Sequence, residues 1–189
     1  MSEAQGVVTA ERSSWTLDPS HTLVEFSAKH MMIARVKGRF GTVSGTVELD
    51  DSDPSRSSAE VTIDASSIDT RNDDRDAHLR SADFLDVETY PTIEFRSKRF
   101  EREGEDRYRV VGDLTIRGET REVVLEMTEE GRAQDPWGNF RIGVSGETLI
   151  DRRDSGLTWN QALEAGGVLV GHEVRISLEV ELVAASEEA

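Results

Sequence analysis

Cysteine is absent from this 189-residue chain, so neither a disulfide framework nor a thiolate metal site is possible. Positive charge is also scarce: 22 lysine and arginine residues stand against 38 aspartate and glutamate residues, a formal net charge of −16 at pH 7. Such a chain is a poor match for nucleic acid, because nucleic-acid binding neutralises phosphates with basic side chains. It is equally unsuited to electrostatic attachment to anionic lipid head groups. The composition therefore predicts no nucleic-acid partner.

Long apolar runs are missing as well. The N-terminus has no basic segment followed by an apolar run of roughly 7–15 residues, the pattern of a signal peptide. Nowhere does the chain hold about 18 consecutive apolar residues, the length that a transmembrane helix needs. We therefore expect a cytoplasmic protein without a transmembrane anchor.

The chain does contain a series of segments in which apolar and polar residues alternate, a period typical of half-buried strands. The clearest lie at 22–30, 43–49, 60–68, 93–95, 108–116, 123–127, 140–150 and 174–182. Gly38, Gly41 and Gly45 permit bends in a long strand that starts near residue 33. Sequential strands with short loops favour an all-β fold, an extended eight-stranded antiparallel barrel. A two-sheet sandwich fits the same periodicity.

The predicted domain is a single barrel over residues 13–184, between a disordered N-terminal tail at 1–12 and a frayed acidic tail at 185–189. One short helical insertion, around residues 74–86, interrupts the strands. Leu79, Phe84 and Leu85 are its large apolar side chains, and Pro91 ends any helix there. Such an insertion can close one end of a barrel core.

Two further segments depart from the strand pattern. Residues 131–138 contain Pro136 and Trp137 and are expected to form a loop. Residues 157–165 are expected to form a second short helix that carries Trp159 and ends at Gly166. In the last strand the apolar residues alternate with polar ones from 173 to 181, so its outer face is too polar for an obligate interface. We expect a monomer or a weak homodimer.

The candidate chemical groups are few. The four histidines fit no metal-binding signature, so we expect no metal and no other cofactor. His30 lies on an apolar face, where a hydrogen-bonded core histidine is the simplest interpretation. His78, Asp76 and His30 could act as acid–base groups in an enzyme, but no nucleophile motif accompanies them. Arg75 and Asp76 are interpreted as ion-paired structural anchors, or Arg75 as the binder of a ligand head group.

Several motifs along nearly the whole chain carry a family resemblance. They include Trp15-x-Leu-Asp-Pro-x-His21, Phe26-x-x-x-His30, Gly38-x-Phe40, Arg75-Asp-x-His-Leu-Arg-Ser-x-Asp-Phe84, Tyr90-Pro-Thr-Ile-x-Phe95, Gly112-Asp-Leu-Thr-Ile-x-Gly-x-Thr120, Arg152-x-Asp154-x-Gly-Leu157 and Val170-Gly-x-x-Val174. In their order and spacing the chain resembles the YceI family of lipocalin-like polyisoprenoid-binding proteins. Two positions depart from the family pattern: Leu85 and Ser155 stand where phenylalanine is frequent.

The resemblance implies a lipocalin-like barrel that holds a long isoprenoid chain in an apolar tunnel. Our main hypothesis is a non-catalytic binding or carrier protein for a polyisoprenoid or another long-chain amphiphilic lipid. The alternatives are an enzyme that uses the barrel as a reaction chamber and a structural protein whose barrel is filled by its own side chains. The predicted ligand-contacting residues are Val24, Phe26, Ala28, His30, Ile63, His78, Leu79, Phe84, Leu85, Phe95, Ile116, Leu125, Ile142, Trp159, Ile176 and Leu178.

Overall fold

A computed structural model describes residues 12–185, so the predicted tails lie outside the described residues except for Arg12 and Ala185. The strands are β1 (Ser13–Leu17), β2 (Leu23–His30), β3 (Ala34–Phe40), β4 (Val43–Leu49), β5 (Ser58–Asp64), β6 (Ile68–Asp69), β7 (Thr92–Arg102), β8 (Arg107–Ile116), β9 (Glu119–Gln134), β10 (Phe140–Asp151) and β11 (Val170–Ala184). The helices in this range are α1 (Asp73–Arg80) and three 3-10 helices, η1 (Pro54–Arg56), η2 (Ala65–Ser67) and η3 (Arg152–Ser155).

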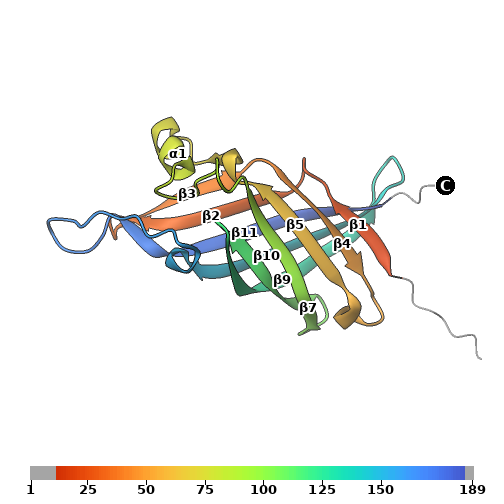
Figure 1. The fold of residues 1–189 in the computed structure, drawn as a ribbon. Helices are drawn as coiled ribbons and strands as arrows, with labels where there is room; N and C mark the ends of the chain where they lie inside the picture. The colour runs from red at the N-terminus through yellow and green to blue at the C-terminus, as the bar shows by residue number, and fades with distance from the viewer. Residues whose placement is uncertain (1–11, 186–189) are drawn as a thin grey trace, which may run out of the picture.

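The strands close into a barrel. The pairing order β1-β4-β5-β7-β8-β9-β10-β11 returns to β1, because β1 also pairs with the end of β11. Every pairing is antiparallel, and Trp15 lies opposite Ala184, so the two ends of the domain are joined by strand pairing. This ring confirms the predicted eight-stranded antiparallel barrel. We call the end of the molecule where β1 pairs with both β4 and β11 the closed end (Figure 1).

Away from the closed end, three strands, β2, β3 and β6, continue the sheet from the other half of β11. They are continuations of β1, β4 and β5, from which they are separated by short breaks. The first break lies between β1 and β2 and contains Pro19, which has no backbone N–H to donate to a neighbouring strand. In the same break the Asp18 carboxylate accepts the Ser20 backbone N–H at 2.9 Å. The second break contains Gly41, one of the predicted bending positions, between β3 and β4. The sheet therefore extends well beyond the closed end along β11.

The opposite end is covered by residues 73–91, which we call the plug, and by η3; we call it the plug end. Helix α1 begins after Asn72, whose side chain accepts the Arg75 backbone N–H at 3.0 Å, and it ends at Arg80 rather than at residue 86. Phe84 and Leu85 follow in a turn and are buried against Ile93 and Ile116. Figure 1 shows α1 outside the strands, far from β1. No helix among the described residues is long and apolar enough to cross a membrane.

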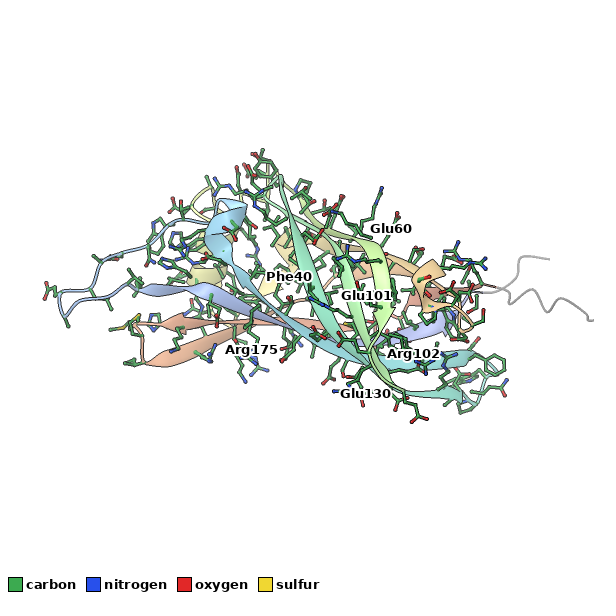
Figure 2. All side chains as sticks on the ribbon, turned by 90° about the horizontal axis from the view of Figure 1, so that it is seen from below. Phe40, Glu60, Glu101, Arg102, Glu130 and Arg175 are labelled. Carbon is green, nitrogen blue, oxygen red and sulfur yellow. The ribbon has the colours of Figure 1, made fainter. Side chains whose placement is uncertain are left out.

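The two faces of the strands differ in the predicted way. On β11 the side chains from Val174 to Leu182 alternate between the interior and the outer surface, and Glu173, Arg175 and Glu179 are exposed. Charged side chains such as Glu60, Glu130 and Arg175 point away from the barrel interior (Figure 2). The buried core forms two clusters: one around Trp15 and Ile142 at the closed end, and one around Phe84 and Leu85 at the plug.

Two local predictions are wrong. Residues 157–165 form no helix: Ala162 pairs with Val168 in an isolated bridge, and Gly166 and Gly167 turn the chain with positive φ. Asn160 explains the extended backbone, because its side chain bonds both the N–H and the C=O of Val170. The loop predicted at 131–138 starts too early, since β9 continues to Gln134.

Candidate ligand-binding cavity

A cavity of about 210 Å³ lies inside the plug end of the barrel, and we call it the wide cavity. A single water needs only about 10–15 Å³ on this measure, so the space is large compared with an ordinary packing defect. Side chains from all eleven described strands and from the plug line it, and nearly all are aliphatic or aromatic. The polar lining residues are Thr22, Glu25, Thr148 and Arg152. Of these, Glu25 is exposed, so its side chain lies toward solvent.

A second cavity of about 150 Å³, the narrow cavity, lies toward the closed end. Six residues line both cavities: Leu17, Val61, Phe95, Leu125, Leu178 and Val180. The two spaces are therefore neighbours along the barrel axis, separated by a neck of apolar side chains. Along β11 the lining runs from Val170 in the wide cavity to Leu182 in the narrow one. At about 3.3 Å per residue, this corresponds to roughly 40 Å of strand.

Most of the predicted ligand-contacting residues line these spaces. The wide cavity takes Val24, Phe26, Ala28, Ile63, Leu79, Phe84, Leu85, Phe95, Ile116, Leu125, Ile176 and Leu178. Ile142 lines the narrow cavity. His30, His78 and Trp159 line neither cavity. That any of these side chains contacts a ligand stays a prediction.

His78 and Trp159 instead pack together on the outer side of the plug. The His78 ring meets the Trp159 ring edge to face with centroids 4.6 Å apart, and it meets Phe84 at 5.0 Å. Its Nε2 lies 2.8 Å from a carboxylate oxygen of Asp83. Phe84 reaches the cavity from this cluster. His78 therefore supports a lining residue from behind and does not itself face the interior.

Arg75 and Asp76 act as anchors, but they are not paired with each other. Both bind Thr70: Asp76 accepts its backbone N–H at 2.9 Å and its hydroxyl at 2.5 Å, while Arg75 donates to its hydroxyl and to its carbonyl, both at 2.8 Å. The predicted ion pair between them is wrong, because the described contacts contain none. Neither residue lines a cavity, so the head-group role for Arg75 has no support from its position.

The sequence interpretation missed Arg152, which lines the wide cavity and is 3% exposed. Its guanidinium donates four hydrogen bonds to the carbonyl oxygens of Leu157, Trp159, Val170 and Gly171, at 2.6 to 3.1 Å. These bonds hold the segment after η3 against the start of β11. Burial lowers the pKa of this guanidinium, although an arginine remains charged in proteins. A signal was present: along β10 the inward positions 142, 144, 148 and 150 continue with a period of two to residue 152.

The narrow cavity ends at acidic residues of the segment between β4 and β5. Asp50 is 1% exposed; its Oδ1 accepts the Ser52 hydroxyl at 2.7 Å and two backbone N–H groups. The bond from Ser52 is the main cause of a lowered pKa at Asp50, so the carboxylate is ionised. Arg132 on β9 holds the same segment through two bonds to Asp51, at 2.8 and 2.9 Å.

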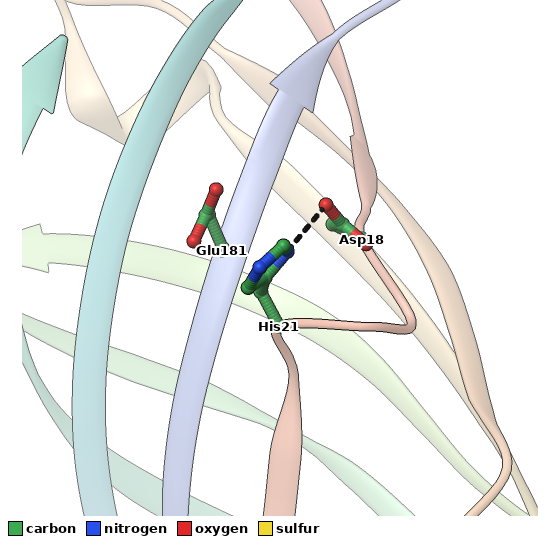
Figure 3. Close-up of side chains that lie close together, drawn as sticks. All are labelled: Asp18, His21 and Glu181. Carbon is green, nitrogen blue, oxygen red and sulfur yellow. Dashed lines mark hydrogen bonds and ion pairs between the residues drawn. The ribbon is translucent and has the colours of Figure 1, made fainter. Parts of the chain in front are cut away.

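A group that could hold a metal ion also lies near the closed end. Asp18, His21 and Glu181 bring ligand atoms within 4.8 Å of one another (Figure 3). Arg141 already occupies this group, donating to Asp18 and to Glu181 at 2.7 Å each. Hydrogen bonds from His21 and Arg141 lower the pKa of Asp18 to about 2. A cation bound here would compete with the guanidinium, so we interpret the group as a salt-bridge network.

The chain was compared with known proteins. The model of the YceI-like domain family matches residues 15–182. A UPF0312 protein of Staphylococcus aureus strain bovine RF122 is 38% identical over 170 residues, covering 89% of this chain and 96% of the relative. A UPF0312 protein of Pectobacterium atrosepticum is 35% identical, with 84% of this chain and 82% of that protein covered.

Solved structures show the same fold. BcnA of Burkholderia cenocepacia superposes with a TM-score of 0.75 and 25% identity, covering 87% of this chain and 98% of that one. The YCEI protein of Campylobacter jejuni gives a TM-score of 0.72 and 29% identity, with coverage of 84% and 90%. A polyisoprenoid binding domain from Saccharophagus degradans gives 0.70 at 18% identity, covering 92% and 99%. The last of these likenesses concerns the fold alone.

Proposed function

Since this chain belongs to the YceI-like domain family, we propose that it is a non-catalytic carrier for a long-chain amphiphilic lipid, a polyisoprenoid or a similar molecule. The observation that carries the proposal is the pair of neighbouring cavities with an almost wholly apolar lining. A solid barrel filled by its own side chains would leave no such space. The neighbour from Saccharophagus degradans, described as a polyisoprenoid binding domain, has the same fold.

The shape of the space favours a long and narrow ligand. The lining follows roughly 40 Å of β11 at about 3.3 Å per residue, and the neck between the cavities is apolar. Each buried CH₂ group contributes about 0.8 kcal/mol to binding. A long hydrocarbon chain can therefore bind tightly with few polar contacts, which matches a lining with only a handful of polar side chains.

The acid–base alternative has little support from geometry. It requires His30, Asp76 or His78 at the cavity, and none of the three lines it. One carboxylate oxygen of Asp76 accepts both hydrogen bonds from Thr70, and His78 contacts Asp83 and two aromatic rings. Replacing His78 with Ala separates the two functions: an enzyme would lose turnover, whereas the proposed carrier retains the ligand with lower plug stability.

Native mass spectrometry of the purified protein tests the proposal. We expect a bound lipid of uniform mass, or uptake of an added long-chain isoprenoid by protein from which lipid has been extracted. Short alcohols of four to six carbons serve as the control, since they cannot fill both cavities. A protein that is consistently empty and takes up no long-chain lipid would refute the carrier function.

We also propose that the carrier is a monomer or a weak homodimer. The support is the polar outer face of β11, where Glu173, Arg175 and Glu179 are exposed. Sedimentation velocity over a hundred-fold concentration range tests this proposal. A dimer that persists at the lowest concentration would contradict it.

A further inference from the structure

The two cavities are lined by buried charges of opposite sign. Arg152 lines the wide cavity at the plug end, and Asp50 lines the narrow cavity at the closed end. They are 3% and 1% exposed. A buried charge that borders an apolar space acts strongly on a ligand there, because the low dielectric constant screens it weakly. The charges therefore distinguish the two directions in which an amphiphile can lie.

Arg152 is an unusual buried cation, since no carboxylate within the described residues forms an ion pair with it. An arginine has five N–H donors, and the four carbonyl bonds use one on Nε, two on Nη1 and one on Nη2. One N–H on Nη2 remains for another acceptor. The neighbouring Arg153 differs: it is exposed and makes three bonds to Asp151. A positively charged side chain with one N–H not used by these four bonds thus lines a cavity whose other lining residues are mostly apolar.

The closed end has the opposite character. Asp50, Asp51, Glu129 and Arg132 are the charged residues that line the narrow cavity, so three negative charges there meet one positive charge. Arg132 is already bound to Asp51 and Glu129. The Oδ2 atom of Asp50 is buried without a hydrogen bond, with only the ion pair to Arg56 Nε at 3.3 Å. An anionic group placed at this end would be repelled.

Resting on the carrier function above, we propose that the ligand bears an anionic, oxygen-containing head group that binds Arg152 at the plug end, while its hydrocarbon tail points toward Asp50. The other polar lining groups do not decide the sign of the head group. Thr22 has a buried hydroxyl without a partner among the described residues, and this group can bind a neutral or a charged atom. Glu25 also borders the wide cavity, but it is exposed, so solvent and salt screen its negative charge more than the buried charge of Arg152.

Bromine quenching of tryptophan fluorescence tests the orientation without disturbing Arg152. Trp159 lies at the plug end, since its carbonyl binds Arg152. Trp15 belongs to the core cluster of the closed end. Trp137 is 83% exposed and is removed as Trp137→Phe in both reporter proteins. A second change, Trp15→Phe or Trp159→Phe, leaves one reporter at one end.

Eicosanoate brominated at carbon 2 and at carbon 20 are the probes. We expect the 2-bromo acid to quench Trp159 more than Trp15, and the 20-bromo acid to show the reverse order. Equal quenching of both reporters by each probe, or the opposite order, overturns the proposal. Binding of neither probe, together with an empty protein in native mass spectrometry, refutes the carrier function instead.

A head-group series then tests Arg152 itself. Dissociation constants are measured for eicosanoate, eicosyl phosphate and eicosanol with the parent protein, Arg152→Gln and the matched control Arg153→Gln. We expect Arg152→Gln to weaken binding of at least one of the two anions about ten-fold relative to the alcohol, and Arg153→Gln to leave both ratios unchanged. The anion with the larger change identifies the head group as carboxylate or phosphate. Unchanged ratios for both anions in a folded Arg152→Gln protein overturn the proposal; if that variant does not fold, the orientation measurement decides.

Discussion

The two ends of the barrel are held by arginines in different ways. At the closed end, Arg132 and Arg141 bind carboxylates: Arg132 binds Asp51, and Arg141 binds Asp18. At the plug end, Arg75, Arg80, Arg117 and Arg152 donate to backbone carbonyls. The closed end therefore holds its arginines in ion pairs with carboxylates, whereas the plug end gathers positive charges on neutral acceptors.

This difference follows from what each end has to join. The closed end connects strands whose backbone groups already pair with one another, so only side chains remain to be linked. The plug end joins irregular segments, whose carbonyls would be buried without partners if arginines did not reach them. Arg117, for example, donates to the carbonyl of Phe84 at 2.9 Å and so fixes the plug to the turn after β8. The arginines at this end thus replace a missing strand ladder.

Of the substitutions that test this difference between the two ends, Phe84→Ala should change the free energy of unfolding most. Phe84 is 6% exposed and lines the wide cavity, so its truncation should lower the free energy of unfolding by about 3–5 kcal/mol. Leu182→Ala is the matched change at the closed end, where Leu182 is 4% exposed; it should cost about 2–5 kcal/mol. Urea unfolding measures both values.

The two variants should differ in ligand release. Only Phe84→Ala removes part of the plug, so only this variant should release bound lipid faster in a stopped-flow transfer to vesicles. Similar release rates for both variants would show that the plug is not the exit.

Introducing a tryptophan ring into each cavity should have a different effect on the protein in the two cases. Ala28 lines the wide cavity and is half-buried, so Ala28→Trp should fill the space and expel ligand with little loss of stability. Ile142 lines the narrow cavity and is 2% exposed, so Ile142→Trp should cost about 1–3 kcal/mol through overpacking. Thermal unfolding and lipid titration measure the two effects. An Ala28→Trp protein that binds lipid as the parent does would show that the lining is placed wrongly.

Acid should affect β1 at the closed end before α1 in the plug; Asp151, whose pKa the hydrogen bond from Arg153 lowers to about 2, lies beside η3 and outside both of these elements. Hydrogen bonds from His21 and Arg141 lower the pKa of Asp18 to about 2, below its unfolded value near 3.9, and Arg132 lowers the pKa of Asp51. A depressed pKa stabilises the fold above the unfolded value, and this stabilisation is lost as pH falls toward the folded value. Between pH 4 and pH 2, roughly, amide resonances of β1 should shift or broaden before those of α1.

Arg141→Gln is the control for this titration. It removes one cause of the low pKa of Asp18, so the β1 resonances should be less sensitive to acid and less stable at neutral pH. His21 responds to pH in the opposite direction. The hydrogen bond to Asp18 raises the pKa of the His21 ring above 6.5, so the stabilisation from this bond is lost as pH rises through the raised pKa. Simultaneous changes at β1 and α1 in acid would argue against separate ends.

The smallest effect is expected on the outer face. Arg175 lies on β11 and pairs with Glu147 at 3.4 Å, with both side chains largely exposed. Arg175→Gln should change the free energy of unfolding by no more than about 0.5 kcal/mol, because exposed pairs are screened by water and salt. Lipid affinity should stay at the parent value in the same titration. A marked loss of affinity would place a binding contact outside the barrel.

Alternation along the chain was enough to predict the barrel and most of its lining. The inward residues of β11 occur at every second position, and a period of two specifies one face without further information. The same rule would have found Arg152, which continues the inward positions of β10. We named Arg152 only as part of a motif that carries the family resemblance; charged residues are almost never fully buried unless paired, so its residue type gave no reason to place it inside the barrel. Two of its four carbonyl partners, Val170 and Gly171, lie 18 and 19 positions away in the sequence.

Trp159 and Asn160 illustrate what local patterns could not supply. Their segment has helix-compatible residues, but Asn160 bonds Val170 ten positions away, and this tertiary contact overrides the local preference. Contacts with residues elsewhere in the fold likewise decide where His78 and Arg75 lie. Both lie in a motif that indicates function, yet one supports Phe84 from outside and the other holds Thr70. A motif identifies important residues without telling which face of the fold they occupy.

Strand β11 gives the chain a definite folding order. One edge of β11 pairs with both β1 and β2, and its other edge pairs with β10 along eleven registered positions. Because β11 is the last of the described strands in chain order, β1, β2 and β10 have unpaired edges until β11 has left the ribosome. Closure must then bring Trp15 beside Ala184, a contact of very long sequence separation, and such contacts form slowly. During synthesis the exposed strand edges are sites for aggregation or for binding by a chaperone.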